Sequence, residues 1–153
     1  MELSLQEKYA PHNKCFGCGV ANEKGLQLKS RVVEDIVIAS WFPQPHHEAF
    51  PGVLNGGIIG ALLDCHSNWT ACYHIMLQQN LTSPPCTVTA YFNVSLKRPT
   101  PSDKEIHLTA KVIQLESDRA KIAAELYCED KLCATCEGLF VAVKPGHPAY
   151  HRW

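Results

Sequence analysis

The chain has 153 residues, of which 46% are hydrophobic and 19% charged, and its formal net charge is -1. This length and composition fit a single domain over residues 1–153, with an N-terminal segment (1–24) and a C-terminal tail (145–153). A nearly neutral chain without a basic run excludes broad binding to a nucleic-acid backbone, so we expect no nucleic-acid partner.

The first 14 residues lack the basic region and the apolar stretch of an export signal. We therefore expect a cytoplasmic protein whose eight cysteines are reduced. The longest apolar stretch, residues 54–76, contains Asp64 and two histidines, which argue against a helix buried in lipid. No membrane association is expected.

Two Cys-x-x-Cys pairs, Cys15/Cys18 and Cys133/Cys136, have the spacing of a four-cysteine zinc site. The second pair lies in a predicted strand, where residues three apart face opposite sides, so its two sulfurs cannot easily reach one metal. The first pair lies in a glycine-containing loop, where it could bind a metal or be oxidised. We predict no metal site and no cofactor.

Two segments rich in β-branched residues, Leu26 to Val33 and Ile36 to Phe42, are separated by an acidic dipeptide and predict a β-hairpin. A proline-rich crossing follows. It ends at His46, His47 and Glu48, for which a solvated loop is a simpler interpretation than a metal cluster. His47 or Glu48 could also line the mouth of a substrate pocket.

The rest of the chain is arranged around one long helix predicted to begin near Asn55, whose side chain can cap the first turn. One stripe of this helix is apolar and predicts a core face: Ile58, Leu62, Cys65, Trp69, Cys72 and Met76. A second stripe has small residues, one carboxylate and one amide: Gly57, Gly60, Ala61, Asp64, Asn68 and Ala71. Small side chains there would let another surface or a ligand approach the backbone.

Asp64 is the unusual member of the small-residue stripe. Apolar neighbours would desolvate its carboxylate and raise its pKa toward neutrality, although a solvated or ion-paired Asp is the alternative. The amides of Gly56 and Gly57 at the helix start could hold a developing oxyanion. Because about 12 Å along the axis separates Gly56 from Asp64, the attacking carboxylate would come from the facing helix of a dimer.

Four strands are predicted after the helix: Thr87 to Leu96, Glu105 to Leu115, Lys121 to Cys128 and Lys131 to Lys144. In the first, Val88, Ala90, Phe92, Val94 and Leu96 alternate with the polar set Thr87, Thr89, Tyr91, Asn93 and Ser95. The order is two strands, one long helix and four strands, which predicts an α+β fold with an antiparallel sheet around the helix. The tail is expected to be extended.

The run PGVLNGGIIGALLDCH resembles the hotdog-fold acyl-CoA thioesterases, especially their phenylacetate-pathway branch, and CFGCGVANEKGLQL resembles the segment before their first strand. The resemblance covers roughly residues 12 to 144 and implies the hotdog fold. It implies that the Gly56 amide meets the thioester carbonyl and that Asp64 of the neighbouring subunit is general base or nucleophile. Asn68 matches a position that orients the acid or water, and Asn55 replaces the family's usual histidine.

The resemblance further implies an acyl-CoA substrate and a homodimer or a dimer of dimers. Lys97 and Arg98 could meet the phosphates of coenzyme A, with an ordinary solvated turn as the alternative. A catalytically silent acyl-CoA binder or regulator remains open because Asn55 cannot titrate near neutrality. A hotdog dehydratase or hydratase is disfavoured, since Gly57 and Pro43 stand where the dehydratases place an acid and a histidine.

Overall fold

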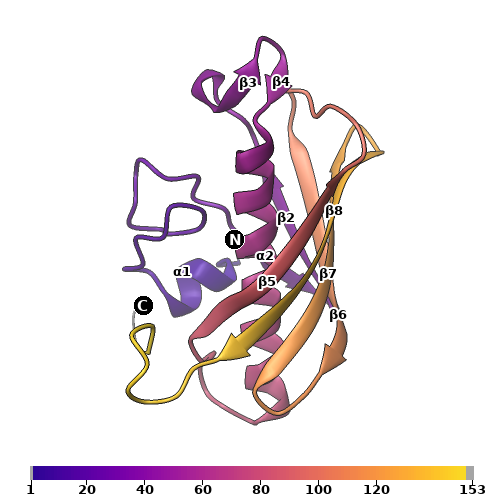
Figure 1. Ribbon diagram of the computed structural model, residues 1–153. Coiled ribbons are helices and arrows are strands. Elements are labelled where there is room, and N and C mark those ends of the chain that lie inside the picture. Colours follow the sequence, from indigo (N-terminus) through magenta and orange to yellow (C-terminus); the bar gives the residue numbers. More distant parts are fainter. Residues whose placement is uncertain (1, 151–153) are drawn as a thin grey trace.

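The computed structural model describes residues 2–150. Helix α2, Gly56–Gln78, runs along the molecule between a six-stranded antiparallel sheet and the N-terminal segment (Figure 1). The predicted architecture, an antiparallel sheet wrapped around one long helix, is confirmed. Within residues 2–150, every helix is too short or too polar to span a bilayer.

The sheet has the strand order β1-β2-β6-β7-β8-β5, and every neighbouring pair is antiparallel. Its strands are β1 Arg31–Val33, β2 Ile36–Trp41, β5 Thr87–Leu96, β6 Ile106–Leu115, β7 Arg119–Cys128 and β8 Lys131–Ala142. The four strands predicted after the helix are therefore confirmed, with ends that differ by at most two residues. Strands β5 and β1 form the two edges.

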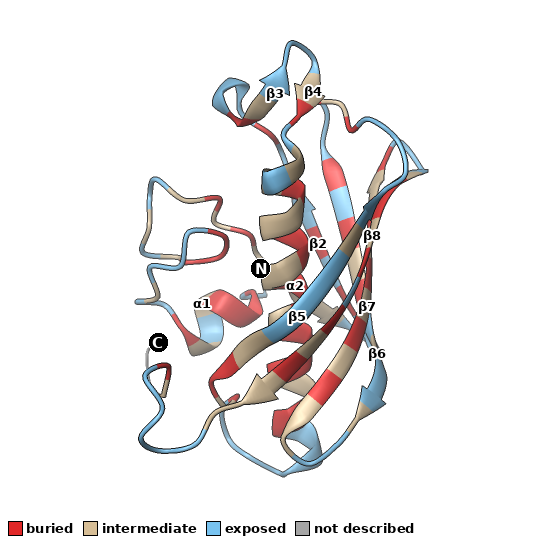
Figure 2. Cartoon of the chain, viewed as in Figure 1, coloured by how far each residue is buried: buried red, intermediate tan, exposed pale blue. Residues whose placement is uncertain are grey.

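Helix α2 begins as predicted, because the Asn55 side chain accepts hydrogen bonds from the amides of Gly57 (2.7 Å) and Ile58 (3.2 Å). The buried part of the helix is wider than one stripe, as Figure 2 shows. Leu62 and Leu63 are both fully buried. Four members of the predicted apolar stripe are buried: Leu62, Trp69, Cys72 and Met76. The other two, Ile58 and Cys65, are only partly buried.

A short helix that the sequence analysis did not predict, α1 Leu5–Tyr9, opens the N-terminal segment. Ser4 and Glu7 form its capping box, which was readable in the sequence as Ser-x-x-Glu. Behind α1, the buried Gln6 donates to the Ser30 hydroxyl, which contacts Nδ1 of the fully buried His66 at 2.9 Å. His66 Nε2 donates to the Val37 carbonyl at 3.0 Å, so this polar chain joins the segment to α2 and β2.

The first strand is shorter than predicted, because β1 begins at Arg31 and not at Leu26. The residues before it pair with the N-terminal loop instead. The Leu26 amide donates to the Phe16 carbonyl at 2.7 Å, and the Leu28 amide donates to the Gly17 carbonyl at 3.1 Å. These bonds hold the loop over α2.

The crossing from β2 to α2 has more structure than predicted. It contains the 3-10 helix Pro45–His47 and a two-stranded ribbon, β3 Glu48–Phe50 and β4 Val53–Leu54. The tail was predicted to be extended, but residues 145–150 form turns that bury Ala149. Gly146, with φ +95, adopts a left-handed conformation that suits such a turn. Residues 151–153 lie outside the described residues.

Candidate active site

Strand β5 packs along the small-residue stripe of α2, and in Figure 1 it crosses the helix diagonally. A Cβ added to Gly56 would lie 3.3 Å from Leu96 Cδ1, and one added to Gly60 would lie 3.8 Å from Phe92 Cε2. The small residues of the stripe therefore allow the edge strand β5 to pack close to the helix backbone.

A β-bulge at Ala90 sets which β5 side chains face the helix. Thr89 lies opposite Phe140 of β8 and Tyr91 lies opposite Leu139, so Ala90 is the extra residue. The predicted strict alternation is wrong across this point. Because the bulge shifts the phase by one residue, Thr89 lies on the same face as Phe92 and points toward α2.

Asp64 is half-buried on α2, and its Oδ1 accepts a hydrogen bond of 2.7 Å from the Thr89 hydroxyl. Burial raises the pKa of this carboxyl above its ordinary value. The Thr89 bond partly offsets that rise, and the nearby Cys15 adds to it. A carboxylate of this kind is a stronger base than an exposed one.

A cavity of about 380 Å³ opens beside Asp64. It is lined by Asn13, Lys14, Cys15, Cys18, Asp64, Cys65, Asn68 and Trp69. Asn68 thus shares the cavity with Asp64. Strand β5 also holds the Asn68 side chain in place, because the Asn68 and Thr87 side chains are hydrogen-bonded to each other.

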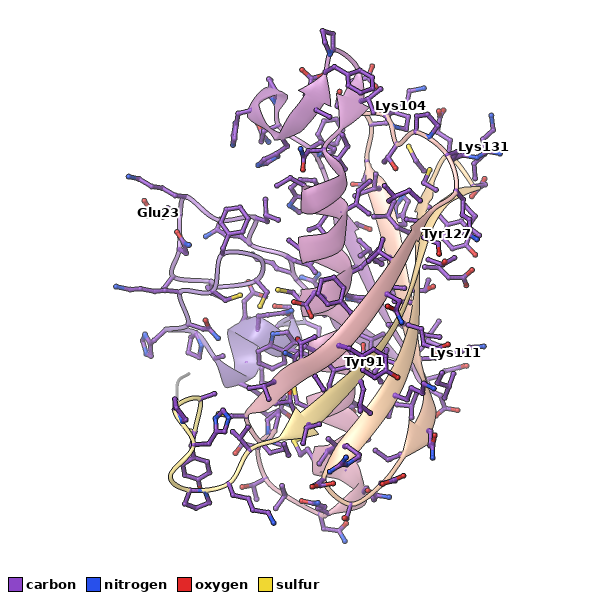
Figure 3. All side chains as sticks on the ribbon, viewed as in Figure 1. Glu23, Tyr91, Lys104, Lys111, Tyr127 and Lys131 are labelled. Carbon is purple, nitrogen blue, oxygen red and sulfur yellow. The ribbon has the colours of Figure 1, made fainter. Side chains whose placement is uncertain are left out.

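Three cysteines form one wall of this cavity. Cys15 and Cys18 belong to the N-terminal loop and Cys65 to α2, and their sulfur atoms all lie within 4.8 Å of one another. Figure 3 shows sulfur atoms gathered between the loop and the helix. Cys133 and Cys136, the second Cys-x-x-Cys pair, lie on β8, as predicted. Sequence reasoning missed Cys65 because it counted this residue in the apolar stripe.

The start of α2 lines a separate cavity of about 420 Å³ that also includes Lys97 and Arg98. Gly56 contributes to this cavity, and in residues 2–150 its amide donates no hydrogen bond. The Gly57 amide is instead occupied by the Asn55 side chain. The structure therefore brings Gly56 together with the two basic residues, but places them apart from Asp64.

His47 and Glu48 line neither of these two cavities. His47 is buried against the Trp41 ring at a centroid distance of 5.0 Å, and burial lowers its pKa. Glu48 accepts hydrogen bonds from the Gly52 amide and the Ser102 hydroxyl, which lower its pKa. Both side chains fix the segment that leads into α2.

No protein-family model and no curated protein matches the chain. Among solved structures, a thioesterase superfamily protein from Shewanella loihica PV-4 is 28% identical, with 82% of this chain and 98% of that chain covered and a TM-score of 0.65. The chain has the hotdog fold of thioesterase-superfamily proteins. Its long helix against an antiparallel sheet is the fold that the resemblance implied.

Two further structures resemble this hotdog protein at lower identity. A phenylacetic acid degradation-related protein from Ralstonia eutropha JMP134, described as a putative thioesterase, is 19% identical over 76% of this chain and 86% of its own, with a TM-score of 0.64. The E. coli PaaI protein of the phenylacetic acid degradation operon is 15% identical over 76% and 83%, with a TM-score of 0.61. At these identities the likeness shows the fold alone.

Proposed function

We propose that this hotdog protein hydrolyses an acyl-CoA thioester to the free acid and coenzyme A. The observation that carries the proposal is Asp64, a half-buried carboxylate with a raised pKa in the wall of a cavity. The hotdog fold that the chain shares with thioesterase-superfamily structures supports the reaction class. Asp64 would either attack the carbonyl carbon directly or remove a proton from the attacking water.

The proposed site combines residues of two protomers. In one chain, eight residues of α2 separate Gly56 from Asp64, or about 12 Å along the axis, which is too far for both to act on one carbonyl. Strand β5 supports pairing, because it is an edge strand whose residues 90–93 are all exposed. We therefore propose a homodimer, alone or within a dimer of dimers, that brings Gly56 of one chain to Asp64 of the other.

Each end of the substrate has a proposed partner. The Gly56 amide would donate to the carbonyl oxygen as negative charge develops on it. Lys97 and Arg98, in the cavity that contains Gly56, would bind coenzyme A phosphates. Asn55 stabilises the helix start that presents this amide, so its contribution would be structural.

The test is thiol release from a panel of acyl-CoA esters that includes phenylacetyl-CoA, with an enzyme-only blank for the protein's own cysteines. We expect Asp64→Asn to reduce kcat by at least about a thousandfold, since it removes the proposed base or nucleophile. Asp35→Asn, in the β1–β2 turn, is the matched control and should keep full activity. Full turnover by Asp64→Asn would refute the assignment.

A second experiment tests the shared site. Proline is tolerated at the first position of a helix but has no amide hydrogen, so Gly56→Pro removes the proposed oxyanion donor and keeps the helix. A refolded equal mixture of Gly56→Pro and Asp64→Asn chains should recover about a quarter of wild-type activity, because random pairing makes half of the dimers mixed and each has one intact site. No recovery would contradict a site built from two chains.

The alternative is an acyl-CoA binder without catalytic activity. It is favoured by one observation: the Asn55 side chain is engaged with two amides of its own helix, so it does not supply the function of the family's histidine. In the thiol-release panel this alternative predicts tight binding of acyl-CoA with no release of coenzyme A.

A further inference from the structure

The three cysteines in the Asp64 cavity form the densest cluster of metal-ligating atoms in residues 2–150. Cys15 and Cys65 are 50 positions apart in the chain, and their sulfur atoms are 3.7 Å apart. Cys18, from the same loop as Cys15, completes the triangle. The first Cys-x-x-Cys pair therefore meets a cysteine of α2, a partner that the sequence analysis did not consider.

We propose that Cys15, Cys18 and Cys65 form a binding site for a zinc-type divalent metal ion, with three thiolate ligands and a fourth position open to the cavity. Zinc binds sulfur at about 2.3 Å in a tetrahedral arrangement, so two of its sulfur ligands lie roughly 3.8 Å apart. The separation of 3.7 Å between Cys15 and Cys65 matches that value. The ion itself would hold the N-terminal loop against α2.

The backbone of the loop is shaped to bring the three sulfur atoms together. A Cβ on Gly19 would lie 2.4 Å from the Cys15 nitrogen, and one on Gly17 would lie 2.4 Å from the Cys65 sulfur. Any side chain at either position would therefore push the loop open. The Gly19 amide also closes the turn by donating to the Cys15 carbonyl at 2.8 Å.

A hydrogen-bond donor from α2 already contacts one of the sulfur atoms. The Trp69 indole donates to the Cys18 sulfur at 3.3 Å. Such donors stabilise the negative charge of thiolate ligands and orient them. Lys14, which lines the same cavity, adds a positive charge beside a site whose three thiolates exceed the charge of one divalent ion.

A disulfide is the competing interpretation, and the geometry favours the metal. A disulfide would join only two of the three sulfur atoms and would leave the third beside it without a function. A metal ion uses all three. The inference is independent of the proposed function, because metal binding is measured without a thioester.

The experiment uses the full chain, purified with a reductant, treated with a chelator and titrated with Co²⁺, which reports thiolate ligands and tetrahedral geometry by absorption. We expect one Co²⁺ per chain, a sulfur-to-metal charge-transfer band, and displacement by Zn²⁺ with loss of the band. Cys65→Ser should weaken binding by at least about tenfold, whereas Cys133→Ser, in the other Cys-x-x-Cys pair, should not.

Three outcomes would overturn the proposal. One is the absence of a charge-transfer band in the folded wild-type chain. Another is an equal loss of binding in Cys65→Ser and Cys133→Ser, both verified as folded by circular dichroism. The third is a disulfide between any two of the three cysteines in protein handled without oxidant, detected by mass spectrometry after alkylation.

Discussion

The two faces of α2 differ in what they contact. The face toward the sheet carries Leu62, Leu63 and His66, all fully buried, and most of the core packs on it. A second face carries Gly60, Asp64 and other small or polar residues, and it contacts the edge strand β5 and the cysteine loop. One helix therefore provides stability on one side and candidate chemistry on the other, and substitutions on the two faces should affect different measurements.

The largest expected difference in stability is between Leu62→Ala and Gly60→Ala. Leu62→Ala leaves a cavity in the core and should lower the free energy of unfolding by about 3 kcal/mol. Gly60→Ala adds a Cβ at an ordinary 3.8 Å from Phe92 and should stay within about 1 kcal/mol of wild type. Urea unfolding measures both values. Equal losses would show that the two faces do not differ as described.

The next effect concerns His66, whose burial should lower the free energy of unfolding in acid. Burial lowers the pKa of His66 from 6.5 to about 4. Between these values the unfolded chain binds a proton that the folded chain does not, so stability is complete above pH 6.5 and falls as the pH drops toward 4. The loss should reach about 3 kcal/mol. His66→Gln should remove most of this pH dependence in urea unfolding, and an unchanged slope would contradict it.

A smaller effect is expected from Thr89→Val, which changes the surroundings of Asp64. This change removes the hydrogen bond that stabilises the Asp64 carboxylate, so the Asp64 pKa should rise further. The acid limb of the pH profile of kcat/KM should move to higher pH, and activity at a fixed acidic pH should fall a few-fold. The unfolding free energy, measured in parallel, separates this from general damage.

The smallest effect is expected at the helix start. Asn55→Ala removes the hydrogen bonds to the Gly57 and Ile58 amides and should lower the free energy of unfolding by about 1 kcal/mol. Asn55→Ser or Asn55→Asp should retain most of that stability, since both can cap a helix. A kcat loss in Asn55→Asp at full stability would instead assign Asn55 a role toward substrate.

The sequence predicted the elements that have a local signal. The Asn55 cap and the alternation after Thr87 were sufficient to predict α2 and β5, and spacing alone placed Asp64 on a face with Asn68. The bulge at Ala90 could not be predicted, because the extra residue is set by the pairing of β5 with β8. Cys65 was assigned to the core because no local pattern indicates that a loop 50 positions earlier folds onto it.

The bulge in β5 marks one position at which this strand can change in length without changing which side chains face the helix. Ala90 is exposed, so many side chains would be accommodated there. Deletion of Ala90 would restore regular pairing and would still leave Thr89 and Phe92 on the face toward the helix. Alignments of this chain with its relatives should therefore place any gap within residues 87–96 at Ala90.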